Sequence, residues 1–466
     1  MRLYERSISI PKLSEASGLL QDMRNAVMTN MPDNEAPVRL VVTRSDQQNW
    51  SCELGLLDGE QHDTIPTDFI FDFKQRDFES SESFNAVLIV PTGIDAQLGG
   101  HAGDAGAVAR LMAGSCDNLI THPNVVNASD LNELADNGLY VEGSILTRLL
   151  MGTVGLQKVR SNRVLVVLDK HEDEFFYEAA INSVSGARAS LGLDCVAVVL
   201  MEDTISMRSL YSNSGRAVGS ITRLERLCKV LEQYHGQYDA VALSSIILVP
   251  RECHMDYFKT DMINPWGGVE SMLTHAVSSL YDIPSAHSPM LEDRAILNLS
   301  VGAVDPRKAA EAVSTTFLHC ILRGLHKSPR IVKNPRLDGQ SGVLTVSDVS
   351  CMVIPDGCVG LPTLAAIEQG IPVIAVRENR NRMHNNLEDL PFASGQLHIV
   401  ENYLEAVGVM NAVRAGVSPE TVRRPMRDTR VEVSGNPVSA GTDEIDAVSN
   451  TESEEHQRDE MGKRTA

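Results

Sequence analysis

From residue 85 onward, short apolar segments rich in valine and isoleucine alternate with longer segments of helical periodicity. This alternation is typical of a parallel sheet with crossover helices, and continuous apolar strands indicate that both faces of the sheet are covered. The expected strands are 86–90, 118–121, 163–169, 195–201, 240–248, 351–354 and 373–376. The expected helices are 105–113, 140–150, 174–190, 220–233, 269–280, 306–325, 361–369 and 403–415. The sequence therefore predicts an α/β fold with mainly parallel sheets.

The chain of 466 residues is long enough to form two or three domains. Before residue 85, a helix over 12–29 and a hairpin of 38–43 with 51–57 predict a small α+β module. After about residue 418 the apolar periodicity stops and acidic residues dominate. We expect four segments: an α+β module at 1–80, a main α/β domain at 81–328, a second α/β unit at 329–417 and a disordered acidic tail at 418–466.

The composition narrows the classes of partner. A net charge of −21, from 41 basic and 62 acidic residues, argues against nucleic acid and against anionic membrane surfaces as partners. The sequence has no apolar stretch long enough to span a membrane and no apolar leader at its beginning. Eight cysteines without a C-x-x-C pair indicate reduced thiols. We therefore expect a soluble, cytoplasmic protein, and we leave open whether it is a homo-oligomer.

A glycine-rich loop follows the strand expected at 86–90, and an alanine-rich helix at 105–113 follows the loop, with Asp104 as its N-cap. A strand, a glycine turn and a helix N-terminus direct unpaired backbone N–H groups toward one point, which suits a phosphate or a carboxylate. The glycine spacing matches neither the dinucleotide-binding nor the P-loop pattern, so the ligand is not identified. A turn required only for tight packing is the alternative. The expected ligand-binding residues of this loop are Gly93, Gly99, Gly100, His101, Gly103 and Asp104.

A second polar loop contains Ser214, Gly215 and Arg216, just before the helix expected at 220–233. A guanidinium group beside a helix N-terminus can hold an anion, so this loop is a second expected anion site. The alternative is a capping turn with a surface arginine.

Polar residues also follow other expected strands, where the carboxyl ends of parallel strands place ligand-binding groups. His122 follows the strand at 118–121 and precedes proline, and Asn124 and Asn127 lie just beyond it. His287 lies in a short extended segment. A hydrogen-bonded structural role is the alternative for each histidine.

The acidic segment 169–174, which includes His171, invites a metal interpretation. Carboxylates at the positive end of the helix that follows explain it more simply, so we expect no metal site there. The sequence leaves any cofactor unknown.

Residues 351–376 predict a compact β-turn-α-turn-β unit, with Asp356 and Gly357 in the first turn. Cys358 stands near the N-terminus of the following helix, where the helix dipole lowers the pKa of a thiol. A thiolate at this place can act as a nucleophile or as a proton carrier. An inert structural cysteine is the alternative.

This unit resembles the second-cysteine region of the aspartate/glutamate racemase superfamily, where a Gly-Cys turn leads into a helix and a Gly-[IV]-Pro-Val strand. The resemblance implies an acid/base role for Cys358, although Cys116 precedes its strand, unlike the first cysteine of that superfamily. The unit is also similar to the nucleotide-sugar-binding unit of two-domain glycosyltransferases. That second resemblance implies that Gly357, Gly360 and Glu368 line a diphosphate and a ribose.

Further segments form a longer pattern: Val90-Pro-Thr-Gly-Ile, Gly99-Gly-His-Ala-Gly-Asp-Ala, Leu119-Ile-Thr-His-Pro-Asn-Val-Val-Asn127, Asn264-Pro-Trp-Gly-Gly-Val-Glu270 and Ile283-Pro-Ser-Ala-His287. Together they resemble a bacterial and plant family defined only as a domain of unknown function. The resemblance covers roughly residues 85–415 and implies one coherent, enzyme-like unit without specifying a reaction.

These observations favour an enzyme that acts on a small anionic metabolite carrying carboxylate or phosphate groups, in a biosynthetic pathway. The expected chemistry is that of a lyase, isomerase or racemase, with Cys358, His122 and His287 as catalytic residues. The alternatives are a glycosyltransferase-like enzyme that uses a nucleotide sugar and a ligand-binding protein without catalysis.

Overall fold

The computed structural model describes residues 1–32, 34–59, 68–337, 342–426, 428–429 and 431. The chain divides into two units, Met1–Pro419 and Glu420–Ala466. The fold and the site belong to the first unit. Most of the tail expected at 418–466 lies outside the described residues.

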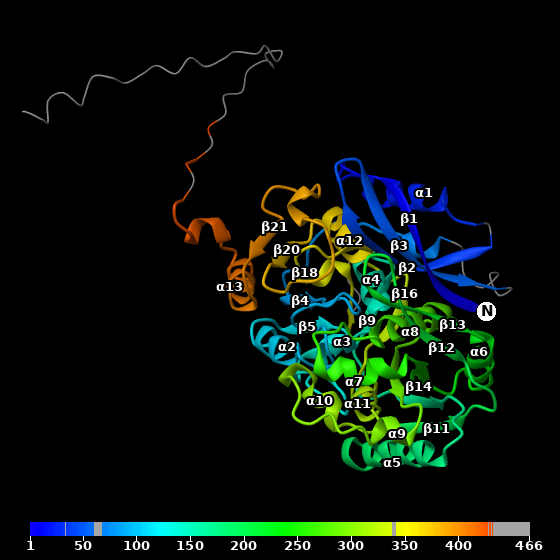
Figure 1. Ribbon diagram of the computed structural model, residues 1–466. Coiled ribbons are helices and arrows are strands. Elements are labelled where there is room, and N and C mark those ends of the chain that lie inside the picture. The colour runs from blue at the N-terminus through cyan, green and yellow to red at the C-terminus, as the bar shows by residue number, and fades with distance from the viewer. Residues whose placement is uncertain (33, 60–67, 338–341, 427, 430, 432–466) are drawn as a thin grey trace, which may run out of the picture. The chain divides into compact units, whose positions relative to one another are not determined.

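A six-stranded sheet forms one half of the first unit, and every strand pair in it is parallel. Figure 1 shows most of its strands side by side. Their order is β21 (Leu397–Val400), β20 (Val373–Val376), β18 (Val349–Pro355), β4 (Asn85–Leu88), β5 (Asn118–Thr121) and β8 (Gly138–Tyr140). The helices that connect or follow these strands are α2 (Gly106–Ala113), α3 (Pro123–Val126), α4 (Gly143–Leu150), α12 (Leu361–Gln369) and α13 (Tyr403–Arg414).

The order in which the strands are added reverses at the middle of this sheet. The chain runs from β4 outward through β5 to β8, then returns to β18 on the other side of β4 and continues to β20 and β21. The two central strands, β4 and β18, therefore define a topological switch point. Strands from both sides of the boundary expected at residue 329 lie in one sheet, so the expected domain limits do not coincide with the limits of the sheets.

A ten-stranded mixed sheet forms the other half. It is parallel around β14 and antiparallel from β12 to β19. Its order is β11 (Asp194–Leu200), β10 (Arg163–Leu168), β14 (Ala240–Leu248), β12 (Ser206–Tyr211), β13 (Ala217–Thr222), β1 (Arg2–Pro11), β3 (Asn49–Asp58), β2 (Glu35–Ser45) and β19 (Val359–Gly360), with β15 (Ser285–Met290) also paired to β14.

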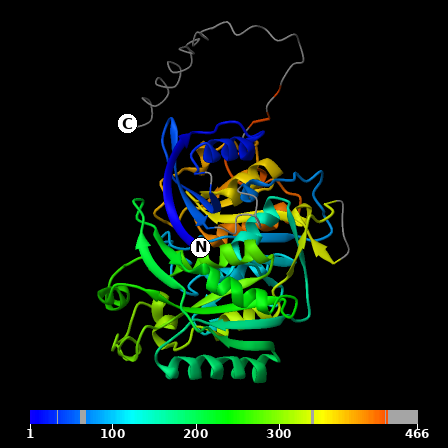
Figure 2. The same cartoon turned by 90° about the vertical axis from the view of Figure 1, so that its right-hand side faces the viewer.

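The remaining helices are α1 (Leu19–Met28), α5 (Glu174–Leu191), α6 (Leu224–Gln233), α7 (Arg251–Lys259), α8 (Gly267–Tyr281), α9 (Arg294–Leu297), α10 (Ala309–Val313) and α11 (His319–His326). Of these, α1, α5, α8 and α11 pack against strands of this larger sheet, and α5 lies beside β11 and α11 (Figure 2). The smaller strands are β6 (Asn127–Ala128), β7 (Leu131–Asn132), β9 (Val154–Gln157), β16 (Arg330–Lys333) and β17 (Val343–Leu344).

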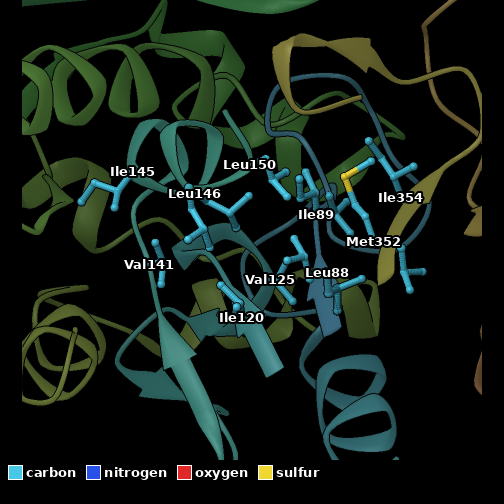
Figure 3. Packing of buried hydrophobic residues seen from close by; sticks show 14 of the residues in the cluster. Leu88, Ile89, Ile120, Val125, Val141, Ile145, Leu146, Leu150, Met352 and Ile354 are labelled. Atoms are coloured by element: carbon cyan, nitrogen blue, oxygen red, sulfur yellow. The ribbon is translucent and has the colours of Figure 1, made fainter. Parts of the chain in front are cut away.

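The core of the parallel sheet consists of branched aliphatic side chains from strands and from the helices above them. Figure 3 shows Leu146 and Leu150 of α4 close to Ile120 of β5 and Ile89 beyond β4. All four are buried. Such residues pack well on a pleated surface covered on both faces, which explains why these strands could be recognised as continuous apolar runs.

Capping groups fix several helix ends. The Asp173 side chain accepts a hydrogen bond from Phe175 N at 3.0 Å at the start of α5, and Asn402 does the same for Glu405 N at 3.1 Å in α13. Gly192 and Gly370, both with positive φ, follow the last residues of α5 and α12.

The expected α/β class with parallel strands is confirmed, and the strands at 118–121, 240–248 and 373–376 have the expected bounds. The expected β-turn-α-turn-β unit is also present as β18, α12 and β20. The ten-stranded sheet is not mainly parallel, because the N-terminal hairpin joins it with antiparallel pairing.

Some expected elements are wrong. The first helix begins at Leu19 and not at residue 12, and Gly18 directly before it has a left-handed backbone with φ 78°. The helix expected from residue 220 begins at Leu224, because Ser220 still belongs to β13. The single helix expected over 306–325 is replaced by separate short helices.

Candidate functional site

A cavity of about 280 Å³, here called the main cavity, lies at the carboxyl end of the parallel sheet. Its lining includes residues just beyond three strands: Ile89 directly after β4, His122 directly after β5 and Glu142 two residues after β8. Ile354 of β18 and Cys358 beyond it line the cavity as well. The cavity therefore opens at the switch point between β4 and β18, where open α/β sheets bind ligands.

The opposite wall comes from the larger sheet and from α8. Residues 38–41 of β2, His287 of β15 and a face of α8 contribute to it. Gly268 lets α8 lie close to β13, since a Cβ there would come within 1.9 Å of the Ala217 carbonyl oxygen. This close approach brings the polar residues of α8 to the cavity.

One carboxylate–histidine pair presents its carboxylate to the main cavity. His287 Nδ1 donates to Glu270 Oε1 at 3.0 Å, and the Ser245 hydroxyl lies 2.7 Å from His287 Nε2. The connectivity is that of a Ser-His-acid triad, but the exposure is reversed. The Glu270 side chain is 24% exposed, the His287 side chain is 1% exposed, and Ser245 lines neither cavity of the described chain. Glu270 is thus the member of this chain of contacts that faces the cavity most openly, and His287 and Ser245 lie behind it.

A second pair presents its imidazole instead. His275 Nδ1 lies 2.6 Å from Glu142 Oε1, and the exposed fractions of the two side chains are 16% and 2%. Burial alone would raise the pKa of Glu142, but His275 and hydrogen bonds from Ser144 bring it below its usual value. Glu142 also caps α4 by accepting from the backbone N–H groups of Ser144 and Ile145. A charged, fixed carboxylate therefore lies beside an imidazole that faces the cavity.

Two buried arginines line the cavity. Arg216 Nη1 lies 2.6 Å from Glu53 Oε2, and Arg39 pairs with Glu5 and donates to Ser271 Oγ at 2.6 Å. Both guanidinium groups therefore have anionic partners within the protein. Each also has a buried Nε–H group with no hydrogen-bond partner among the described residues.

A third arginine is less fully paired. Arg148 of α4 donates to Asp282 Oδ1 at 2.7 Å, and its Nη1 is buried with no hydrogen-bond partner among the described residues. Arg148 lines the main cavity with a side chain that is 17% exposed. A buried N–H group without a partner is costly, so this group is a natural contact for an oxygen of a bound anion.

Two of the expected catalytic residues are uncharged groups. His122 Nε2 accepts from Val90 N at 3.0 Å, and burial lowers the pKa of this histidine to about 4. The ring is therefore neutral and carries its proton on Nδ1. Burial raises the pKa of the Cys358 thiol, so the lowering expected from the helix dipole is wrong. The desolvation of the thiol outweighs the dipole because pairing of β19 with β2 covers the segment that follows Cys358.

The glycine loop uses its amides within the protein. Gly99 N donates to Asp104 Oδ1 at 2.7 Å, and Ala102 N donates to Glu311 Oε1 at 2.8 Å. Asp104 is not the N-cap of α2, since Ala105 takes that position without a side-chain cap. A Cβ on Gly103 would come within 2.2 Å of Ala128. The carboxylates bound by these amides are therefore the protein's own.

None of the six residues expected to bind ligand in this loop lines the main cavity, although their neighbours Thr92, Ile94 and Ala102 do. His101 is buried behind the cavity, where its Nδ1 lies 2.8 Å from the Tyr257 hydroxyl. Tyr257 in turn donates to Glu311 Oε1 at 2.9 Å.

Glu311 should make the stability of the protein depend on pH. Burial raises its pKa from the ordinary value of 4.5 to about 7. Between these two pH values the folded chain holds more protons than the unfolded chain. The contribution of Glu311 to the free energy of unfolding is therefore fully present below pH 4.5, and about 3 kcal/mol of it is lost as the pH rises through 7. We expect Glu311→Gln to flatten urea-unfolding free energies measured from pH 4.5 to 8. The exposed Glu174→Gln is the matched control, and an unchanged pH slope in Glu311→Gln would contradict the assignment.

The loop with Ser214 does not precede a helix. It is the turn of the β12–β13 hairpin, closed by Gly215 N donating to Ser212 O at 2.9 Å, and the next helix begins only at Leu224. The expected arginine clamp is corrected as well, because Arg216 is 1% exposed and bound to Glu53. Arg216 lines the main cavity, whereas Ser214 and Gly215 do not.

Of four further residues expected to bind the substrate, two line the main cavity and two do not. Asn124 and Asn127 line the main cavity, where Asn124 Nδ2 donates to Val90 O and Gly99 O and Asn127 Nδ2 donates to the Tyr140 hydroxyl. Asp356 and Gly357 do not line it, and Gly357 N donates to Asp356 Oδ1 within the turn.

The structure thus brings together His122, His287, Cys358, Arg216 and the two asparagines. Sequence reasoning missed Glu142, Glu270, His275 and Arg148 as site residues. Glu142 follows the three-residue strand β8, which was too short to recognise. The others lie on helices that face the cavity and leave no strand-end signal.

The described residues contain no group of three or more histidine, cysteine, aspartate or glutamate side chains placed to bind a metal ion. No helix in the described part of the chain combines the length and apolar character of a membrane span.

Comparisons with known proteins identify a family but no reaction. Residues 85–423 match the family described as "Protein of unknown function (DUF3326)". The chain is also 33% identical over 342 residues to a protein of Synechococcus sp. (strain ATCC 27144 / PCC 6301 / SAUG 1402/1) named an uncharacterized lipoprotein, an alignment covering 72% of this chain and 92% of the relative. No solved structure matches.

These comparisons correct one expectation and settle another. The expectation of a cytoplasmic location is wrong, because the relative that matches most of the chain is named a lipoprotein. The expected membership in a family of unknown function is confirmed, and the comparisons do not show the racemase resemblance. The chain belongs to the DUF3326 family of proteins of unknown function.

Proposed function

We propose that this protein is an enzyme that transfers protons on a small anionic metabolite bound in the main cavity, with chemistry of the lyase, isomerase or racemase type. The observation that carries the proposal is the pair of carboxylate–histidine contacts with opposite exposure, Glu270–His287 and Glu142–His275. One offers a carboxylate and the other an imidazole to the same cavity. A base and an acid facing one ligand are what such reactions require.

The arginines support an anionic substrate. Arg148 has a buried N–H group without a partner and lines the same cavity as Glu270 and His275. A carboxylate or phosphate oxygen would complete its hydrogen bonds. In this proposal Cys358 and His122 act as neutral groups, a thiol and an Nδ1–H imidazole that donate hydrogen bonds to the ligand or relay a proton.

We also propose a location for the protein in the cell. The name of the Synechococcus relative supports a membrane-anchored setting for this chain.

Solvent exchange tests the function without knowledge of the full reaction. The protein is incubated in D2O with a panel of hydroxy acids, dicarboxylates and phosphorylated acids, and carbon-bound hydrogen is followed by NMR. An acid/base enzyme replaces hydrogen by deuterium on the carbon next to the acid group of its ligand. Ligands that bind, as seen by thermal shift, but show no exchange would indicate a binding protein and contradict the proposal.

Arg148 should decide the affinity for the anion. Arg148→Gln removes a charge-assisted hydrogen bond, so we expect the dissociation constant of an acid identified by the panel to rise about 10- to 100-fold. Isothermal titration calorimetry measures this change. The matched control is Arg294→Gln, whose side chain is 58% exposed and lies outside the cavity. Equal dissociation constants of the acid for the two variants would show that Arg148 does not bind the anion.

A further inference from the structure

A second cavity of about 170 Å³ adjoins the main cavity. The two share five lining residues, among them Glu270 and His287. The carboxylate assigned above as the reactive group therefore stands in the wall between two compartments. A ligand in contact with Glu270 from one side has a second compartment directly beyond it.

The two compartments differ in their charged groups. Much of the second cavity is lined by apolar side chains, among them Trp266, Phe258, Leu297, Leu299 and Ile321. None of the three arginines of the main cavity lines it.

The carboxylates of the second cavity already have partners in the protein. Glu311 accepts from Ala102 N and the Tyr257 hydroxyl, and burial raises the pKa of its side chain to about 7. Glu292 accepts from Val249 N at 3.3 Å and lies 3.8 Å from His254 Nε2. Two polar atoms of residues in this lining, Ser129 Oγ and His254 Nε2, are buried without a hydrogen-bond partner among the described residues. The rest of what the second cavity offers a ligand is mainly apolar surface, which favours burial of alkyl or aryl groups.

We propose that the second cavity receives an apolar substituent of the same acid whose charged group binds in the main cavity. The substrate class is then an organic acid that carries an alkyl or aryl side chain. This inference rests on the proposed function. It places Glu270 beside the carbon that joins the acid group to its substituent, which is the carbon whose proton such enzymes exchange.

The test is a chain-length series of linear monocarboxylates from butyrate to decanoate, titrated into the full chain by calorimetry. Each added methylene that enters an apolar compartment should tighten binding about fourfold, until the second cavity is full. Equal affinity for butyrate and octanoate would overturn the inference.

Variants locate the effect. Ala312 of α10 lines the second cavity and not the main one. Ala312→Leu should weaken octanoate binding at least tenfold and leave butyrate binding unchanged, whereas Ala309→Leu, at an exposed position of the same helix, should match the parent chain. Leu297→Ala, which enlarges the cavity, should move the best chain length upward. If Ala312→Leu and Leu297→Ala both leave the affinity for octanoate unchanged, the alkyl chain binds elsewhere and the inference is overturned.

The outcomes separate the two proposals. Binding of butyrate without any gain from longer chains contradicts the second compartment alone. Binding of no acid at all contradicts the proposed function, and this inference with it.

Discussion

Glu270→Gln is expected to slow deuterium exchange into a bound acid by about 10²- to 10⁴-fold, the usual contribution of a positioned acid or base. The amide oxygen can still accept from His287 Nδ1, so the geometry around the cavity is retained while the proton acceptor is lost. Exchange rates from NMR, measured with saturating acid, give the factor directly.

Two comparisons make this result specific. Binding of the acid by Glu270→Gln should stay within a few-fold of the parent chain, which separates a catalytic loss from a loss of binding. Glu174→Gln, at an exposed position on α5, should exchange at the parent rate. An exchange rate in Glu270→Gln equal to that of the Glu174 control would show that Glu270 is not the base.

Arg216→Met is expected to lower the free energy of unfolding by about 3–5 kcal/mol. Arg216 is 1% exposed, and Glu53, its partner at 2.6 Å, is 3% exposed. Glu5 Oε2 lies 4.0 Å from the same guanidinium group. Removal of the arginine leaves Glu53 buried without its counter-ion, and the cost of that uncompensated charge is the expected effect. Urea unfolding measures it.

The matched control is Arg294→Met, because Arg294 pairs with Asp173 at the surface, where an ion pair contributes at most about 1 kcal/mol. The double variant Arg216→Met with Glu53→Leu should regain much of the lost stability, since a buried ion pair can be replaced by apolar groups of similar size. A loss in Arg216→Met no larger than in the surface control would refute this account.

The sequence predicts the frame of the site because its signals are local. An apolar strand followed at once by a polar residue marks a strand end, and this rule located His122 after β5 and Cys358 near the end of β18. Parallel strands share one direction, so residues beyond their carboxyl ends meet at one edge without any knowledge of the contacts.

The chemistry of the site depends on contacts that no local pattern records. Glu270 and His275 reach the cavity because α8 packs closely on β13 through Gly268. The sequence predicts Arg216 as an anion clamp in a turn, but Glu53 of a distant strand already neutralises it. In both cases the chain segment is ordinary, and its partner, far away in sequence, decides the role.

The same reason explains the error at Cys358. A helix N-terminus can be recognised from sequence, and its effect on a thiol follows from the dipole. The opposing effect, desolvation, requires knowing that β2 of the other sheet covers the adjoining segment. A prediction of the thiol pKa from the helix alone cannot include the desolvation caused by a strand of the other sheet.

The pairing of β4 with β18 has a consequence for folding of the chain during its translation. Asn85 of β4 lies beside Val349 of β18, so the central strand of the sheet is translated long before its neighbour. Until then one edge of β4 presents unpaired amides and carbonyls, an edge open to association with other chains. A ribosome-bound nascent chain would thus need protection at this edge by a chaperone, and a premature stop before β18 should yield insoluble fragments.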